Sequence, residues 1–108
     1  MYPNKVLEYY ADLGYWYKYG YGYKINGETS CQFMKDIKET FEKKKRRGTF
    51  YFDHEQGLLP FLTLLGLYKD DFTLTHDIYG EEKVANRKWQ SSRIGSFAQN
   101  TGFVFFDL

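Results

Sequence analysis

A histidine, a carboxylic acid and an amide follow one another near the middle of the chain, within the stretch TFYFDHEQGLLPFLTLLGL. The stretch is typical of a short strand, a tight turn and an apolar helix, which places His54, Glu55 and Gln56 where strand and helix meet. Helix N-termini at such junctions favour phosphate, because their free backbone N–H groups point outward. One His-Glu pair does not make an active site, so the rest of the chain has to supply or exclude the other groups.

Composition limits the class of protein that these residues can serve. The 108 residues suffice for one modest domain, and 15 Lys and Arg nearly balance 14 Asp and Glu, which argues against nucleic acid as the partner. The 11 Tyr and 10 Phe favour a packed chain over a disordered one. No apolar run has the length of a membrane span, the first residues lack the features of a signal peptide, and no pattern indicates a cofactor or metal ligands.

Two amphipathic helices are expected before the His54 stretch. Apolar residues at three- and four-residue spacing predict the first over Pro3–Tyr17. A capping box formed by Thr29 and Gln32 predicts that the second runs over Ser30–Lys45. The basic run KKKRR should end this second helix, with the following glycine closing its last turn. The tyrosine-rich stretch between the two helices is expected to form an ordered loop.

The second half of the chain offers a third helix and further strand signals. Residues 58–67 are apolar on nearly every side and predict a buried helix that Gly66 closes. Residues 102–108, GFVFFDL, predict a strand, and residues 94–99, IGSFAQ, a weaker one. The expected order of elements is therefore α-α-β-α-β-β, and the expected class is α/β or α+β. A helix that is apolar all round needs more protein around it than these residues contain.

Three long stretches of the chain carry a resemblance to a known family. They are DLGYWYKYGYGYKINGETSCQFMKDI, FDHEQGLLPFLTLLGLYKD and NRKWQSSRIGSFAQNTGFVFF. Together they resemble the C-terminal portion of the multiple inositol polyphosphate phosphatases, a branch of the histidine acid phosphatases. The resemblance implies a three-layer α/β fold with a mostly parallel sheet flanked by helices, of which residues 1–108 would be a partial domain.

The resemblance also implies roles for the central residues. In the family, a histidine of an Arg-His-Gly motif attacks phosphorus, and water then hydrolyses the phosphohistidine. His54 matches a second histidine, which helps to neutralise the phosphoryl oxygens. The family's proton donor is a glutamate two residues after this histidine, where this chain has Gln56. Either Glu55 serves instead, as the aspartate of a His-Asp pair does in the wider family, or the acid has been lost.

The nucleophile is missing from these residues. The chain contains no Arg-His-Gly, and its other histidine, His76, has no arginine or glycine turn beside it. The expected function is a phosphomonoesterase acting on inositol polyphosphates such as phytate, present here only as the C-terminal part and inactive alone. Its partners would be the phosphomonoester substrate and the remainder of the parent domain. The alternative is a non-catalytic remnant that binds phosphorylated ligands or a protein through Gln56–Leu58.

Two further expectations depend on the resemblance. The parent protein would reside in the endoplasmic reticulum lumen or be secreted, and Cys31, the only cysteine here, would then form a disulfide outside these residues rather than act as a reactive thiol. The basic run is expected to be a solvated helix end, with an electrostatic funnel for inositol phosphates as the alternative.

Overall fold

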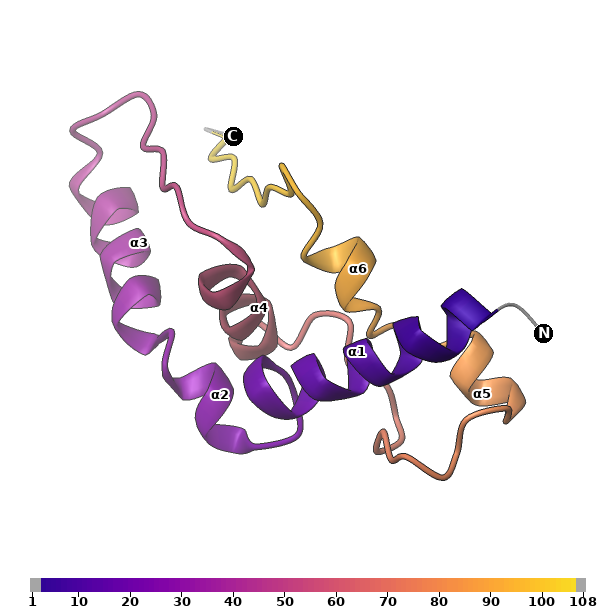
Figure 1. The fold of residues 1–108 in the computed structure, drawn as a ribbon. Coiled ribbons are helices and arrows are strands. Elements are labelled where there is room, and N and C mark those ends of the chain that lie inside the picture. Colours follow the sequence, from indigo (N-terminus) through magenta and orange to yellow (C-terminus); the bar gives the residue numbers. More distant parts are fainter. Residues whose placement is uncertain (1–2, 107–108) are drawn as a thin grey trace.

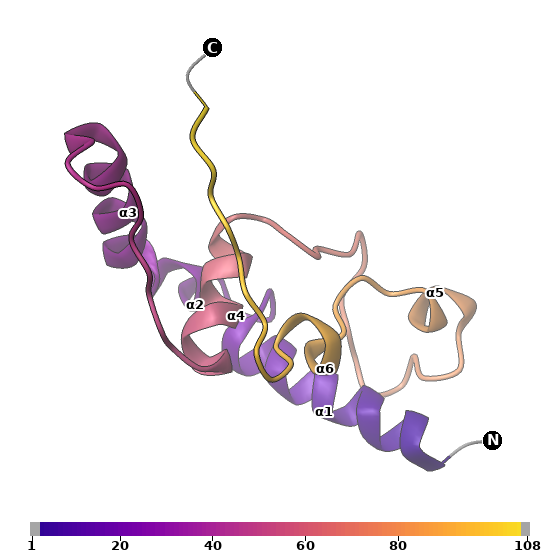
Figure 2. The ribbon, with the colours of Figure 1, turned by 90° about the horizontal axis from the view of Figure 1, so that it is seen from above.

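The computed structural model describes residues 3–106, and within this range the chain forms six helices and no strand (Figure 1). The helices, in chain order, are α1 (Pro3–Tyr19), α2 (Lys24–Glu28), α3 (Cys31–Lys43), α4 (Glu55–Leu64), α5 (Glu82–Ala85) and α6 (Ser91–Ile94). Helix α1 runs along one side of the molecule, and α4 and α6 pack against it (Figures 1 and 2). Helix α2 packs on both α1 and α4, and α3 extends away from them.

Helix α1 confirms the prediction of an N-terminal amphipathic helix, although it continues two residues past Tyr17. Its buried face carries Tyr9, Asp12 and Trp16, which follow one another at three- and four-residue spacing. The helix ends at a tight turn, in which the Gly20 N–H donates to the Trp16 carbonyl at 3.1 Å. The buried face of α1 therefore runs the length of the helix and includes one carboxylate.

Two of the glycines near this turn permit close packing between elements. A Cβ atom on Gly20 would lie 2.8 Å from the indole carbons of Trp89, and one on Gly27 would lie 3.3 Å from the Leu64 backbone. The second approach brings α2 against α4. The prediction of a loop throughout Gly20–Glu28 is thus wrong at its C-terminal half, because Lys24–Glu28 forms α2.

Helix α3 is found where the second helix was predicted, but its ends differ. The residue before it is Ser30, whose side chain makes no capping bond, and the Thr29 hydroxyl instead donates to the Asn26 carbonyl at 2.7 Å. The expected capping box therefore does not form. At the other end, Lys44 takes the left-handed conformation with φ 45°, so the helix stops before Gly48 is reached.

The core lies between α1, α4 and the segments that follow α4. Helix α4 begins three residues earlier than predicted, and Gly66, at φ 73°, lies in the turn just past its end. The connection after α4 contributes a buried leucine, Leu74, and the short helix α5. The core residues are Tyr9, Trp16, Leu59, Leu62, Leu74, Val84, Trp89 and Ile94.

The predicted α/β class is wrong for residues 3–106, because no strand or sheet forms there. Residues 49–52 and 102–106 are extended, but a strand requires backbone hydrogen bonds from a neighbouring strand, and these segments have none within the described range. Residues 94–99 form the end of α6 and a turn instead of the weaker strand. The aromatic side chains of the extended segments pack partly on helices: the Phe103 ring lies 6.0 Å from that of Phe61.

Candidate functional site at the start of helix α4

His54 occupies the N-cap position of α4, directly before the first helical residue, at the predicted junction. Its backbone is extended, at φ −113° and ψ −176°, and its side chain is 66% exposed. No side chain caps the helix, and the backbone N–H groups of Glu55 and Gln56 donate to no acceptor among the described residues. An exposed imidazole thus stands beside two free amide donors at the positive end of a helix dipole, which is an arrangement suited to an anion.

Asp53, the residue before His54, contacts both its backbone and its side chain. Its Oδ1 atom accepts the His54 backbone N–H at 2.8 Å and lies 3.5 Å from the imidazole Nδ1. Gly57 makes room for this carboxylate, since a Cβ atom there would lie 1.7 Å from Asp53 Oδ2. The sequence analysis missed Asp53 as a contact of His54, although the Asp-His-x-x-Gly spacing at a helix start was available as a signal.

Glu55 has a different environment from its two neighbours. It is half-buried and lines a cavity of about 550 Å³ between α1, the start of α4 and α6, which neither His54 nor Gln56 lines. A Cβ atom on Gly95, at the end of α6, would lie 3.4 Å from the Glu55 Cβ. The cavity also presents the carboxylates of Glu8 and Asp12. Gln56 is exposed, so the three predicted site residues are adjacent in sequence but do not share one environment.

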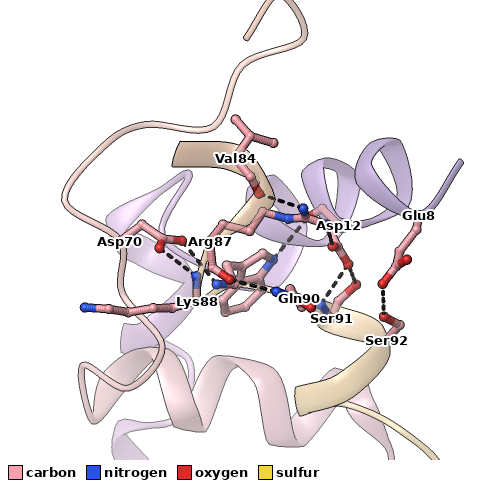
Figure 3. A network of polar contacts seen from close by, with 10 residues as sticks. Glu8, Asp12, Asp70, Val84, Arg87, Lys88, Gln90, Ser91 and Ser92 are labelled. Carbon is pink, nitrogen blue, oxygen red and sulfur yellow. Dashed lines mark hydrogen bonds and ion pairs between the residues drawn. The ribbon is translucent and has the colours of Figure 1, made fainter. Parts of the chain in front are cut away.

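A buried polar network joins α1 to α6 and the segment before it (Figure 3), and two of its residues, Asp12 and Ser91, also line this cavity. The Asp12 Oδ1 atom accepts the backbone N–H of Ser91 at 2.8 Å and its hydroxyl at 2.6 Å. The other carboxylate oxygen pairs with the Arg87 guanidinium. The Trp89 indole N–H donates to the Asp12 carbonyl at 3.1 Å. These bonds fasten α6 and the segment before it to α1.

A second aspartate continues the network from the loop after α4. Asp70 accepts the backbone N–H groups of Lys88 at 2.7 Å and Trp89 at 3.1 Å (Figure 3). The sequence analysis missed Asp12, Asp70 and Arg87 altogether. The one available signal was the spacing of Asp12, three residues after Tyr9 and four before Trp16, on a face that differs from the one predicted for the first helix.

Comparisons with known proteins support the resemblance. The chain is 38% identical over 112 residues to multiple inositol polyphosphate phosphatase 1 of Homo sapiens, which covers 94% of this chain and 23% of the relative. The protein of the same name in Drosophila melanogaster is 37% identical over 103 residues, covering 94% and 22%. That of Gallus gallus is 36% identical over 112 residues, covering 94% and 25%. No family model matches the chain, and no solved structure matches it.

The similarity relates this chain to a class of phosphatases. More particularly, the chain is a homologue of the multiple inositol polyphosphate phosphatases and corresponds to their C-terminal portion. It spans 22–25% of the length of the curated relatives it matches. Among the described residues, no helix combines the length and the apolar character needed to cross a membrane.

Proposed function

We propose that this chain contributes the phosphate-neutralising histidine to a phosphomonoesterase of the inositol polyphosphate type. The observation that carries the proposal is the position of His54, exposed at an uncapped helix N-terminus with two free backbone N–H groups beside it. The names of the homologous phosphatases support a phosphoester as the ligand. His54 and the two amides would neutralise the negative charge that spreads over the phosphoryl oxygens in the transition state.

The 108 residues alone should not hydrolyse phosphate esters. His54 is proposed to stabilise charge and not to attack phosphorus, and no Arg-His-Gly is available in this chain to supply a nucleophile. The test is to add phytate or a chromogenic phosphate ester to the purified chain, and we expect no turnover. Hydrolysis that His54→Ala abolishes would contradict this division of roles, because His54 would then be acting as the nucleophile.

In an enzyme that contains this chain together with a nucleophilic histidine, His54→Ala should lower turnover. We expect a loss of roughly a hundredfold or more, as for other single groups that stabilise transition-state charge. Gln56→Ala is the matched control, since the Gln56 side chain is also exposed at the same helix start but carries no charge. Equal activity of His54→Ala and Gln56→Ala would contradict the proposed role of His54.

The proton donor is the second part of the proposal, and Glu55 is the candidate carboxylate. Glu55→Gln should slow esters with poor alkoxide leaving groups much more than activated aryl esters, because an aryl oxide departs without protonation. If Glu55→Gln lowers the hydrolysis rates of both classes of ester equally, or lowers neither rate, Glu55 is not the acid. Gln56→Glu, which restores the family spacing, should then raise turnover on inositol phosphates.

A non-catalytic role is the second candidate, and one observation favours it. No side chain of His54, Glu55 or Gln56 forms a hydrogen bond or ion pair with an arginine anywhere in residues 3–106. A remnant of this kind would bind phosphorylated ligands, or a protein, through Gln56–Leu58 without turnover. The intact mass of the native protein, together with any Arg-His-Gly motif encoded before Met1, separates the two candidates.

We further propose that the parent protein passes through the endoplasmic reticulum. Cys31, the first residue of α3, is exposed and has no disulfide partner among the described residues. In an oxidising compartment it would be free to pair with a cysteine outside the chain. Thiol labelling of the native protein under denaturing conditions, before and after reduction, tests this: Cys31 that labels fully before reduction contradicts the disulfide.

A further inference from the structure

A second hollow lies between the C-terminal half of α3 and the chain that returns beside it. In Figure 1 the segment after α3 turns back and runs along this helix toward α4, and the Tyr51 hydroxyl fixes it there by donating to the Asp36 carboxylate at 2.6 Å. The hollow between them has a volume of about 350 Å³. The residues of its lining that matter here are Asp36, Lys43, Lys45, Arg46, Thr49 and Tyr51.

The charges around this hollow do not cancel. Three cations line it, Lys43, Lys45 and Arg46, against the single carboxylate of Asp36. Lys43 lies 3.5 Å from Glu39 in an exposed pair, whereas neither Lys45 nor Arg46 forms an ion pair with any residue in the described range. The C-terminal end of α3 carries partial negative charge of its own, so these side chains are what makes the hollow attractive to an anion.

Thr49 supplies a separate observation that points to a ligand. It lines the hollow, and its Oγ1 atom is buried without a hydrogen-bond partner among the described residues. A buried hydroxyl that bonds to nothing is unfavourable, and buried polar atoms are nearly always satisfied. The hydrogen of this hydroxyl is free to rotate, so an acceptor held in the hollow would supply the missing partner.

We propose that this hollow binds a phosphate group of a phosphorylated small molecule, at a site separate from His54. Arg46 offers a planar pair of donors that matches phosphate oxygens, Lys43 and Lys45 add two point charges, and the Thr49 hydroxyl supplies a neutral donor. A dianion balances the excess of two positive charges that the lining carries. The basic run is then more than a solvated helix end, and its role does not depend on the catalytic role of His54.

Calorimetric titration of the 108-residue chain with phytate at pH 7 and low salt tests the proposal. Lys45→Gln with Arg46→Gln should weaken binding about tenfold or more, because charge-assisted hydrogen bonds are lost. The matched control is Lys35→Gln with Arg47→Gln, which removes one lysine and one arginine of the same region that do not line the hollow. We expect this control to bind phytate nearly as well as the wild type, and equal losses in the two double variants would overturn the site.

Two further arms identify the ligand group and separate this site from His54. Inorganic phosphate should displace phytate, whereas chloride at the same ionic strength should not; equal displacement by the two salts overturns the proposal. The titration is repeated in a His54→Ala chain, which removes the phosphate contact proposed at the start of α4: phytate binding that remains there and is weakened by Lys45→Gln with Arg46→Gln belongs to this hollow, whereas loss of all binding in His54→Ala would assign the phosphate to His54 instead. The result at this hollow is therefore independent of the proposed phosphatase function.

Thr49→Val should change stability and phytate binding in opposite directions. In phosphate-free buffer it should raise the melting temperature, because it replaces an unpartnered buried hydroxyl by a methyl group of similar shape. The same substitution should weaken phytate binding, because the neutral donor is lost. A Thr49→Val chain that binds phytate as tightly as the wild type would overturn the role of the hydroxyl.

Discussion

The buried carboxylate of Asp12 should control the stability of the whole chain. Its side chain is 1% exposed, and it satisfies the Ser91 N–H, the Ser91 hydroxyl and an Arg87 guanidinium that is itself only 9% exposed. Asp12→Ala would leave all three donors without this acceptor and one charge buried without its partner. Breaking a buried ion pair in this way costs about 3–5 kcal/mol, out of the roughly 5–15 kcal/mol that stabilises a small protein.

Urea and thermal unfolding followed by tryptophan fluorescence measure this loss directly, because Trp16 and Trp89 both lie in the core. For a domain of this size, each kcal/mol shifts the melting temperature by about 4–8 °C, so the smaller bound predicts a fall of at least about 12 °C. Glu8→Ala is the matched control. Glu8 lies one turn earlier on α1 and accepts the Ser92 hydroxyl at 2.9 Å, a bond worth about 0.5–1.5 kcal/mol.

The comparison between the two variants decides the point. If Asp12→Ala and Glu8→Ala shift the unfolding midpoint by the same amount, the network around Asp12 does not hold α6 to α1, and the reasoning from burial is refuted. A loss of cooperative unfolding in Asp12→Ala alone supports it, since α6 and the segment before it then lose their common acceptor on α1.

Three other substitutions test packing, titration and exposure. Gly20→Ala, in the turn after α1, should destabilise the chain by about 1–3 kcal/mol, because the new methyl group meets an indole ring at 2.8 Å. Gly14→Ala, within α1, meets nothing within 4 Å and should stabilise the chain by about 0.5–1 kcal/mol; urea midpoints compare the two variants. Burial raises the pKa of Tyr21 to about 12. The protonated phenol therefore stabilises the fold fully below pH 10, and that contribution is lost as the pH rises toward 12. In a titration followed by tyrosinate absorbance, the part of the signal that is present in the wild type and absent from Tyr21→Phe should appear near pH 12. Phe50 and Phe52 are 83% and 94% exposed, so the chain should self-associate and bind an apolar dye, and Phe50→Ser with Phe52→Ser should reduce both; a wild type that is already a dye-free monomer contradicts this.

The three longer helices, α1, α3 and α4, were predictable from apolar residues at helical spacing, whereas the short helices α2, α5 and α6 were not predicted. The three- and four-residue spacing of Val6, Leu7, Tyr10, Ala11 and Tyr17 predicted helix α1 correctly but predicted the wrong buried face. Leu7, Tyr10 and Tyr17 are exposed, and the buried face carries Tyr9, Asp12 and Trp16 instead. The helix ends were less predictable. Lys44 stops α3 in a left-handed conformation that the sequence pattern assigned to a glycine four residues later.

Strands could not be predicted on the same basis. The aromatic and β-branched run Thr49–Phe52 satisfies the local preference for a strand, but a strand forms only where a neighbour supplies hydrogen bonds. Pairing is a property of two segments, and a pattern in one segment cannot establish it. Asp12 escaped prediction for a related reason: its partners Arg87 and Ser91 lie 75 and 79 residues away in sequence.

The positions of the three candidate site residues follow from the geometry of the helix that they begin. Successive residues of an α-helix point about 100° apart, while residues four apart share a face. Glu55 therefore lies on the face of Leu59, and a Cβ atom on Gly95 would lie close to both, at 3.4 Å from the Glu55 Cβ and 3.2 Å from a Leu59 methyl group. The contact of Leu59 with the core thus turns Glu55 toward α6, whereas Gln56 turns outward and His54 remains exposed before the helix. A carboxylate at position 55 and a carboxylate at position 56 consequently approach a phosphate bound at His54 from different directions. This is why Glu55→Gln and Gln56→Glu should have distinct effects on esters with poor leaving groups.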